Sequence, residues 1–129
     1  MTTTASRGQL AAAISNAMVG IHSKHYGKGP TKAKTYLIDD TVVCVMQDVF
    51  TTVERTLIDA GKGDLVREVR TTFQYSLRDE FIGAVEEIVG RRPRAFMGQI
   101  DCDADMAVEL FLLEENGVTD ITQANGEAS

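Results

Sequence analysis

Two segments of this chain have the composition of β-hairpins, and they constrain the fold more than any other feature. Residues 32–50 are rich in Val, Ile, Thr and Tyr and are divided by Asp39-Asp40. Aspartate tolerates turn dihedrals and bonds its own backbone, so this pair predicts a tight turn. If these two residues form the loop, Ile38 pairs with Thr41, and this fixes the next two residue pairs along the two strands. They are Leu37 with Val42 and Tyr36 with Val43.

The second hairpin is predicted at residues 94–100 and 106–113, around an acidic turn at residues 101–105. Alternation along a strand sends successive side chains to opposite faces of a sheet. We therefore expect one apolar set of this hairpin to be buried. That set is Phe96, Ile100, Val108, Leu110 and Leu112.

Helical patterns precede and separate the hairpins. Ser6 and Gln9 have the spacing of a capping box, and apolar residues then recur every three or four positions to about His25. Glycines and a proline at 27–30 end that helix. A second capping box, Thr51 and Glu54, begins a short helix that ends at Gly61.

The longest pattern runs from Gly63 to Gly90 and predicts a single helix with one apolar stripe. The stripe comprises Leu65, Val66, Val69, Phe73, Leu77, Phe81, Ala84, Val85 and Ile88. About 26 helical residues span ~39 Å, which exceeds the width of a small domain. We therefore expect part of the stripe to face a second subunit, in a homodimer or a larger homo-oligomer.

The element order α-ββ-α-α-ββ predicts an α+β fold, in which a four-stranded, mainly antiparallel sheet carries helices on one face. The 129 residues suffice for one domain. We assign residues 8–114 to that domain, residues 1–7 to a flexible N-terminus and residues 115–129 to a disordered acidic tail.

Composition argues against several classes of function. A net charge of −6 disfavours binding to nucleic acid. No strictly apolar run is longer than that of residues 42–46, which is far shorter than the ~20 residues of a membrane helix. The first residues lack the pattern of a signal peptide, so we expect a cytoplasmic protein that does not span a membrane. Cys44 and Cys102 make neither a disulfide framework nor a zinc site.

The candidate binding site with the clearest chemistry is the glycine-bearing loop and the lysines around it. It comprises Gly27, Lys28, Gly29, Pro30, Lys32 and Lys34. Loop N–H groups and ammonium groups together suit phosphate, bicarbonate, a nucleotide or an acidic protein surface. The spacing differs from that of a phosphate-binding loop. The alternative interpretation is a helix stop followed by a solvated strand.

Three other clusters have structural interpretations. Asp101, Asp103 and Asp105 begin like a calcium loop, but Met106 and Leu112 stand where that loop needs Gly and Glu. We expect them to form a charged hairpin tip. His22 and His25 have no metal-ligating residue close in sequence, and His22 is expected at the boundary of the core. Arg91, Arg92 and Arg94 form a basic turn that complements a helix C-terminus.

Several segments together resemble the MpsC-like (YbcI-like) family of small bacterial proteins over about residues 8–114. They are Tyr26–Pro30, Lys34–Asp40, Phe50–Leu57, Leu65-Val66 with Arg70, Gln99–Asp101 and Phe111–Leu113. The family name refers to a Na⁺-translocating, membrane-potential-generating system. The resemblance implies a membrane-protein context, with relatives encoded beside membrane subunits and beside a partner linked to inorganic carbon uptake. It implies no catalytic residues.

These observations favour a non-catalytic accessory or regulatory subunit of a membrane ion or inorganic-carbon transport system. It would act by protein–protein contact, including contact with a membrane-complex protein. We expect no cofactor, no bound metal and no enzymatic activity. The alternative is a sensor of small anionic ligands that uses the loop Gly27–Pro30.

Overall fold

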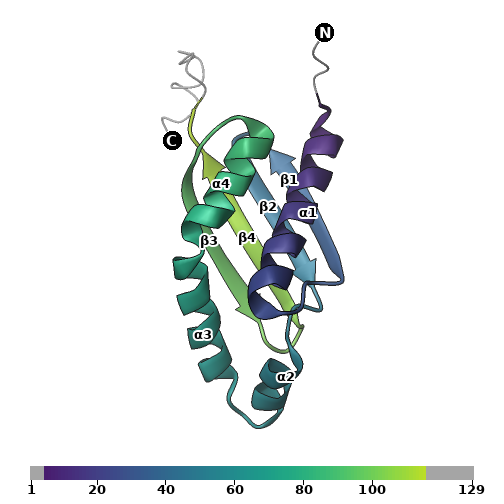
Figure 1. The fold of residues 1–129 in the computed structure, drawn as a ribbon, viewed down its shortest axis with the longest axis vertical. Coiled ribbons are helices and arrows are strands. Elements are labelled where there is room, and N and C mark those ends of the chain that lie inside the picture. Colours follow the sequence, from purple (N-terminus) through teal and green to yellow (C-terminus); the bar gives the residue numbers. More distant parts are fainter. Residues whose placement is uncertain (1–4, 116–129) are drawn as a thin grey trace.

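The structure, a computed structural model, describes residues 5–115 as a sheet with helices on one side (Figure 1). Residues 116–129 of the predicted acidic tail and residues 1–4 of the predicted flexible N-terminus lie outside the described residues. In chain order the elements are α1 (Arg7–Tyr26), β1 (Lys32–Ile38), β2 (Thr41–Gln47), α2 (Thr52–Asp59), α3 (Gly63–Ser76), α4 (Arg78–Val89), β3 (Pro93–Asp101) and β4 (Met106–Leu113).

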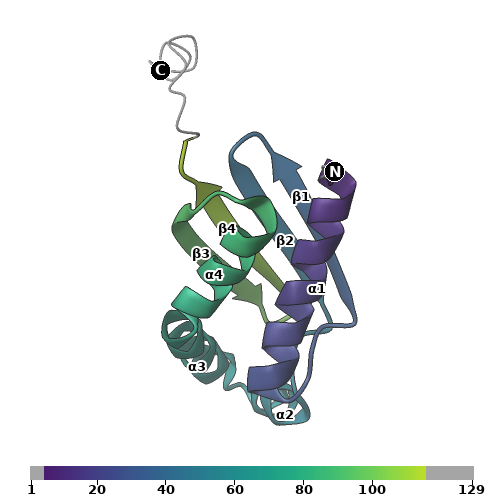
Figure 2. The same ribbon diagram turned by 45° about the horizontal axis from the view of Figure 1, so that its top comes forward.

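The sheet has the strand order β1-β2-β4-β3, and neighbouring strands are antiparallel. The two hairpins therefore lie side by side through β2 and β4. The predicted register of the first hairpin is confirmed, since Ile38 pairs with Thr41 and Tyr36 with Val43. α1 and α4 cross one face of the sheet, whereas α2 and α3 extend beyond one end of the strands (Figures 1 and 2). The predicted α+β fold class is confirmed.

Both predicted capping boxes are present. The Ser6 hydroxyl accepts from the backbone N–H of Gln9 at 3.1 Å, and the Gln9 side chain accepts from the Ser6 N–H at 2.8 Å. The same exchange joins Thr51 and Glu54 at the start of α2. Gly27 ends α1 with φ 80°, a left-handed conformation that costs glycine little.

The prediction of a single long helix is wrong, because the chain breaks at Leu77 into α3 and α4. Leu77 leaves helical geometry with φ −99° and ψ 6°. Its N–H still bonds the carbonyl of Phe73, and its carbonyl accepts from Phe81. The break lets α4 turn across the sheet while α3 runs past its end (Figure 1). A straight helix could not do both.

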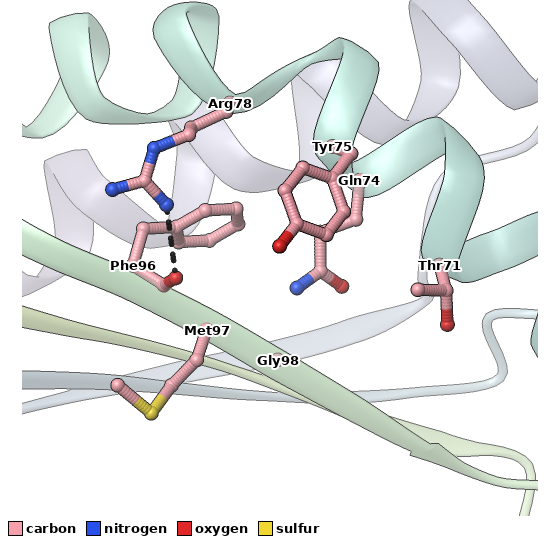
Figure 3. A pocket seen from close by; sticks show the side chains of 7 residues that line it. All are labelled: Thr71, Gln74, Tyr75, Arg78, Phe96, Met97 and Gly98. Atoms are coloured by element: carbon pink, nitrogen blue, oxygen red, sulfur yellow. Dashed lines mark hydrogen bonds between the residues drawn. The ribbon is translucent and has the colours of Figure 1, made fainter.

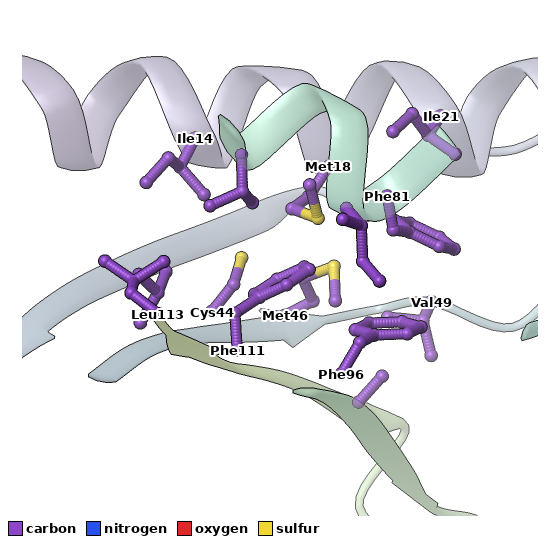
Figure 4. Close-up of a cluster of buried hydrophobic side chains, with 14 of the residues drawn as sticks. Ile14, Met18, Ile21, Cys44, Met46, Val49, Phe81, Phe96, Phe111 and Leu113 are labelled. Atoms are coloured by element: carbon purple, nitrogen blue, oxygen red, sulfur yellow. The ribbon is translucent and has the colours of Figure 1, made fainter. Parts of the chain in front are cut away.

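The core lies between α1, α4 and the sheet, and three aromatic rings form its centre (Figure 4). Phe81 of α4 stacks on Phe96 of β3 at 5.1 Å, and Phe96 stacks on Phe111 of β4 at 4.9 Å. Burying three such rings stabilises the helix layer against the sheet. Ile14 and Met18 close the core from α1.

The prediction of which residues of β4 are buried is wrong, because the buried side chains alternate one position out of step with the predicted set. Phe96 pairs with Phe111, and Ile100 with Ala107, so β4 presents its odd-numbered residues to the helices. Val108, Leu110 and Leu112 therefore point to the other side of the sheet, which no described helix covers. We call that side the open face. The error arose because β4 is apolar at even positions too, so alternation alone could not choose.

Candidate functional site

A buried ion pair between α2 and α3 is the first part of the candidate site. Arg70 donates from Nε and Nη2 to the two carboxylate oxygens of Glu54, each at 2.6 Å. Its Nη2 also donates to the carbonyl of Val49 at 2.9 Å. Arg70 is 4% exposed and Glu54 8%. Such a bidentate pair fixes direction as well as distance.

Glu54 serves the ion pair and the helix cap together, because its Oε1 also accepts from the Thr51 N–H at 2.9 Å. Burial alone would raise the pKa of Glu54, but the hydrogen bonds from Arg70 and Thr51 outweigh it. The pKa therefore lies below its ordinary value, and Glu54 is ionised at neutral pH.

A second buried pair joins α1 to β4. His22 Nε2 lies 3.1 Å from Glu109 Oε1, and the residues are 3% and 4% exposed. The expectation that His22 lies at the core boundary is therefore wrong. The physical reason is long-range, since the carboxylate that allows the imidazole to be buried is 87 positions away in sequence.

Tyr26 connects the two pairs. Its ring lies 5.4 Å from the ring of His22, and the Arg70 guanidinium carbon lies 3.8 Å from its centroid. Burial, chiefly, raises the pKa of Tyr26 to about 12, so the phenol stays neutral. A cation over a desolvated ring is favourable. We call His22, Tyr26, Glu54, Arg70 and Glu109 the buried polar cluster.

Four members of the cluster, His22, Tyr26, Arg70 and Glu109, line a cavity of about 10 Å³, which fits one water molecule. Among the described residues, three buried atoms at the cluster have no hydrogen-bond partner: His22 Nδ1, Arg70 Nη1 and Glu109 Oε2. Because every member is half-buried or more deeply buried, the arrangement is better suited to positioning the surrounding helices than to turning over a substrate.

A shallow groove of about 200 Å³ lies outside the cluster, between α3–α4 and the edge strand β3 (Figure 3). Arg78 bridges it by donating from Nη1 to the carbonyl of Phe96 at 3.2 Å. Gln74 and Gly98 separate the groove from Glu109. A Cβ at position 98 would lie only 2.4 Å from Glu109 Oε2 and 2.9 Å from Gln74 Oε1. Glycine is thus what allows these groups to come so close.

The residues of the predicted loop site are divided between two surfaces. Lys28 turns inward and donates from Nζ to the carbonyl of Asp48 at 2.5 Å, and it lies 3.4 Å from the Asp48 carboxylate. Lys32 and Lys34 lie on β1 at the open face. Gly29 packs closely, because a Cβ there would lie 3.0 Å from the Val19 carbonyl. Anion binding at this loop stays a prediction.

For that prediction we expect small chemical-shift changes, or none, at the amides of Gly27 and Gly29 on titration with millimolar phosphate or bicarbonate. The reason is that Asp48 already neutralises Lys28 and adds negative charge to the loop. Two-dimensional NMR of the ¹⁵N-labelled chain measures this directly. A saturating shift at both glycines, absent in Lys28→Met, would instead establish the anion site.

Three of the other residues singled out from the sequence, Asp101, Asp105 and His25, have hydrogen-bond partners within the fold. Asp105 accepts from the N–H groups of Val49 and Phe50, at 2.8 and 3.1 Å, and Asp101 accepts from Ala104. His25 bonds a carboxylate that is distant in sequence, Glu80 on α4, at 2.8 Å.

Two arginines of the predicted basic turn and both cysteines are also accounted for by contacts within the fold. Arg91 bonds Asp40 at 2.7 Å, and Arg92 bonds Glu86 on α4 at 3.2 Å. Burial raises the pKa of the Cys44 thiol to about 11, which suits an inert core residue. Cys102 is half-buried against the carbonyl of Gly63.

Comparison with family models gives a match that covers nearly the whole described chain. The model described as "Na+-translocating membrane potential-generating system (MpsC)" matches residues 6–115. The chain belongs to the MpsC family. Comparisons with curated proteins and with solved structures give no match. Within residues 5–115 of this MpsC chain, no helix has both the length and the apolar character needed to cross a membrane.

The buried polar cluster lies entirely inside the MpsC match, yet sequence reasoning did not identify it as a site. Two signals were available. Glu109 is the one charged residue in the apolar strand 106–113, and Arg70 interrupts an apolar helical pattern. A charge in such a position is buried only with a partner. The partners could not be found from sequence, since they come from other elements.

Proposed function

We propose that this MpsC-family chain is a non-catalytic accessory or regulatory subunit of a Na⁺-translocating membrane system and acts through protein–protein contact. The description of the MpsC family supports the link to a Na⁺-translocating system. The observation that carries the contact is an apolar stripe on the outer side of α3. Leu65, Val69 and Phe73 follow at intervals of four residues and are 45%, 42% and 38% exposed. This spacing is that of a helix laid against a partner.

The buried polar cluster supports this use of α3, because it fixes the helix that carries the stripe. α3 extends past the sheet (Figure 1). Arg70 ties it to α2 through Glu54, and the Phe73 ring contacts Tyr26 of α1 at 5.1 Å. A docking helix held in one orientation loses less entropy on binding than a mobile one.

The test is co-purification with the membrane subunits of the Na⁺-translocating system from the same organism, after co-expression and solubilisation in detergent. We expect the double substitution Leu65→Ser/Val69→Ser to reduce recovery at least tenfold, because two apolar anchors are lost from the contact. Thermal unfolding should change little, since both side chains are exposed.

Tyr75→Ser is the matched control, because Tyr75 is 78% exposed on the same helix but lies on a different side. This variant should co-purify like the wild type. Equal recovery of the wild type and of Leu65→Ser/Val69→Ser would rule out the stripe as the contact. If the wild type itself fails to co-purify, the proposed function is wrong.

A further inference from the structure

The open face of the sheet has an ordered distribution of apolar and charged side chains. Because the strands are in register, the residues on this face form four rows across β1, β2, β4 and β3. In order along the strands, the rows are Lys32-Gln47-Met106-Asp101, Lys34-Val45-Val108-Gln99, Tyr36-Val43-Leu110-Met97 and Ile38-Thr41-Leu112-Ala95. The two central strands contribute no charged residue to these rows.

Large apolar side chains on this face are accessible. Ile38 is 59% exposed, Met97 51% and Tyr36 43%. Val43, Val45, Val108, Leu110 and Leu112 add a half-buried apolar centre. A continuous uncharged patch over four strands is unusual on a surface that faces only water.

One backbone carbonyl on each edge strand already accepts from an arginine, which favours the face over the edges as a contact surface. On β1, Arg7 donates from Nη2 to the carbonyl of Leu37 at 2.6 Å. On β3, Arg78 donates to the carbonyl of Phe96 at 3.2 Å. An edge carbonyl that is already bonded by a long cationic side chain is a poor template for an added strand.

The charges on the open face lie at its two margins and have opposite sign. Lys32 and Lys34 are on the β1 edge, and Asp101 is on the β3 edge in the same row as Lys32. Lys34 Nζ lies 5.3 Å from the Tyr36 centroid, which confirms that it projects on this side. Asp101 uses Oδ1 to accept from Ala104 and remains exposed.

We propose that the open face binds a second copy of this chain, about a two-fold axis that runs between and parallel to β2 and β4. This operation lays β1 of one copy over β3 of the other and β2 over β4, within the usual range of aligned sheet packing. Each Lys32 then faces Asp101 of the second copy, and the pair occurs twice. The apolar centres meet between them.

The shape of the face fits the same axis. A hollow of about 370 Å³ lies beside Asp101 and is lined by Val45, Met106, Val108 and Gln99, among others. The operation brings Lys32 and Lys34 of the second copy to this hollow. At the opposite end, the large Ile38 meets the small Ala95, so that the two layers can interdigitate.

The other face-to-face arrangement has its axis perpendicular to the strands, and it lays β1 over β1. Lys32 would then meet Ile38 and Lys34 would meet Tyr36 of the second copy. The Lys32 ammonium would face an apolar side chain and Asp101 would face Ala95, so neither of these charges would meet an opposite charge. Charge complementarity therefore selects the axis parallel to the strands.

Sedimentation velocity and light scattering on the full chain, over about 1–100 µM, test the proposal. We expect a dimer, and Met97→Lys should raise its dissociation constant at least about tenfold by placing two cations in the contact. Val53→Lys is the control, because Val53 is 68% exposed on α2 and is not one of the residues of the open face. It should dimerise like the wild type, and thermal unfolding should be similar for all three proteins.

A charge exchange tests the axis. Lys32→Glu and Asp101→Lys should each raise the dissociation constant several-fold, and the double variant Lys32→Glu/Asp101→Lys should restore it. A monomeric wild type at 100 µM, a dimer unaffected by Met97→Lys, or failure of the double variant to recover would each overturn the proposal. The inference is independent of the proposed function. The α3 stripe is not part of the open face, and the co-purification test uses none of the variants at Met97, Lys32 or Asp101.

Discussion

Replacing Arg70 by methionine is expected to lower the free energy of unfolding by about 3–5 kcal/mol, because it leaves one charge of a buried pair uncompensated. Glu54 would lose both hydrogen bonds of 2.6 Å while its carboxylate stayed buried. Tyr26 would lose the guanidinium that lies 3.8 Å from its ring centroid. Methionine is similar in length, so loss of packing contributes little. Urea denaturation monitored by circular dichroism measures the difference in the free energy of unfolding between the wild type and Arg70→Met.

The double variant Arg70→Met/Glu54→Gln tests whether the uncompensated charge of Glu54, and not another effect of losing Arg70, causes the loss of stability. Glutamine at position 54 can still close the capping box with Thr51 but carries no charge. We expect it to recover at least half of the lost stability, since a neutral pair needs no compensating cation. A double variant as unstable as Arg70→Met would show that the buried charge is not the cause.

The Glu54–Arg70 pair also predicts how the free energy of unfolding changes at acid pH. The pKa of Glu54 is lowered in the folded state from an ordinary value of 4.5, so its ionised form binds Arg70 more strongly than its protonated form does. The contribution to stability is therefore complete above pH 4.5 and is lost as the pH falls through the lower, folded-state pKa. The gap in stability between wild type and Arg70→Met should narrow as the pH falls towards and through that range, because protonation also removes the uncompensated charge of the variant.

Features set by neighbouring residues were predictable from sequence, and features set by distant residues were not. Both capping boxes and the Asp39-Asp40 hairpin register depend on contacts a few positions apart. The break at Leu77 carries no glycine or proline, and the apolar period continues across it, so only packing on the sheet reveals it. The apolar content of β4 on both faces concealed which one is buried.

The candidate site illustrates the same division. Arg70 and Glu54 are 16 positions apart, and His22 and Glu109 are 87 apart. Arg70 and Glu109 each interrupt an apolar pattern, which indicates a buried charge, but the sequence does not show which distant residue is its partner. Folding brings them together where α1, α2 and α3 meet the end of the sheet. A cluster that costs desolvation energy at that junction fixes the orientation of α3, and the proposed contact with a membrane subunit depends on that orientation.

Gly98→Ala is expected to destabilise the protein by at least about 2 kcal/mol, because the added methyl has no room. Its Cβ would lie 2.4 Å from Glu109 Oε2 and 2.8 Å from the carbonyl oxygen of Val108. The Val108 carbonyl belongs to the paired strand and cannot move without disturbing the sheet. Glu109 could move only by straining its bond to His22. The loss should appear as a lower midpoint in thermal and urea unfolding.

Gly20→Ala is the matched control for Gly98→Ala. A Cβ at position 20 meets nothing within 4 Å, and the residue is exposed inside α1. Alanine there should stabilise the helix by up to about 1 kcal/mol, because it restricts the unfolded chain and favours helix. Opposite signs for the same chemical change would show that close approach of Glu109, and not backbone flexibility, requires glycine at position 98. Equal effects at both positions would contradict that role.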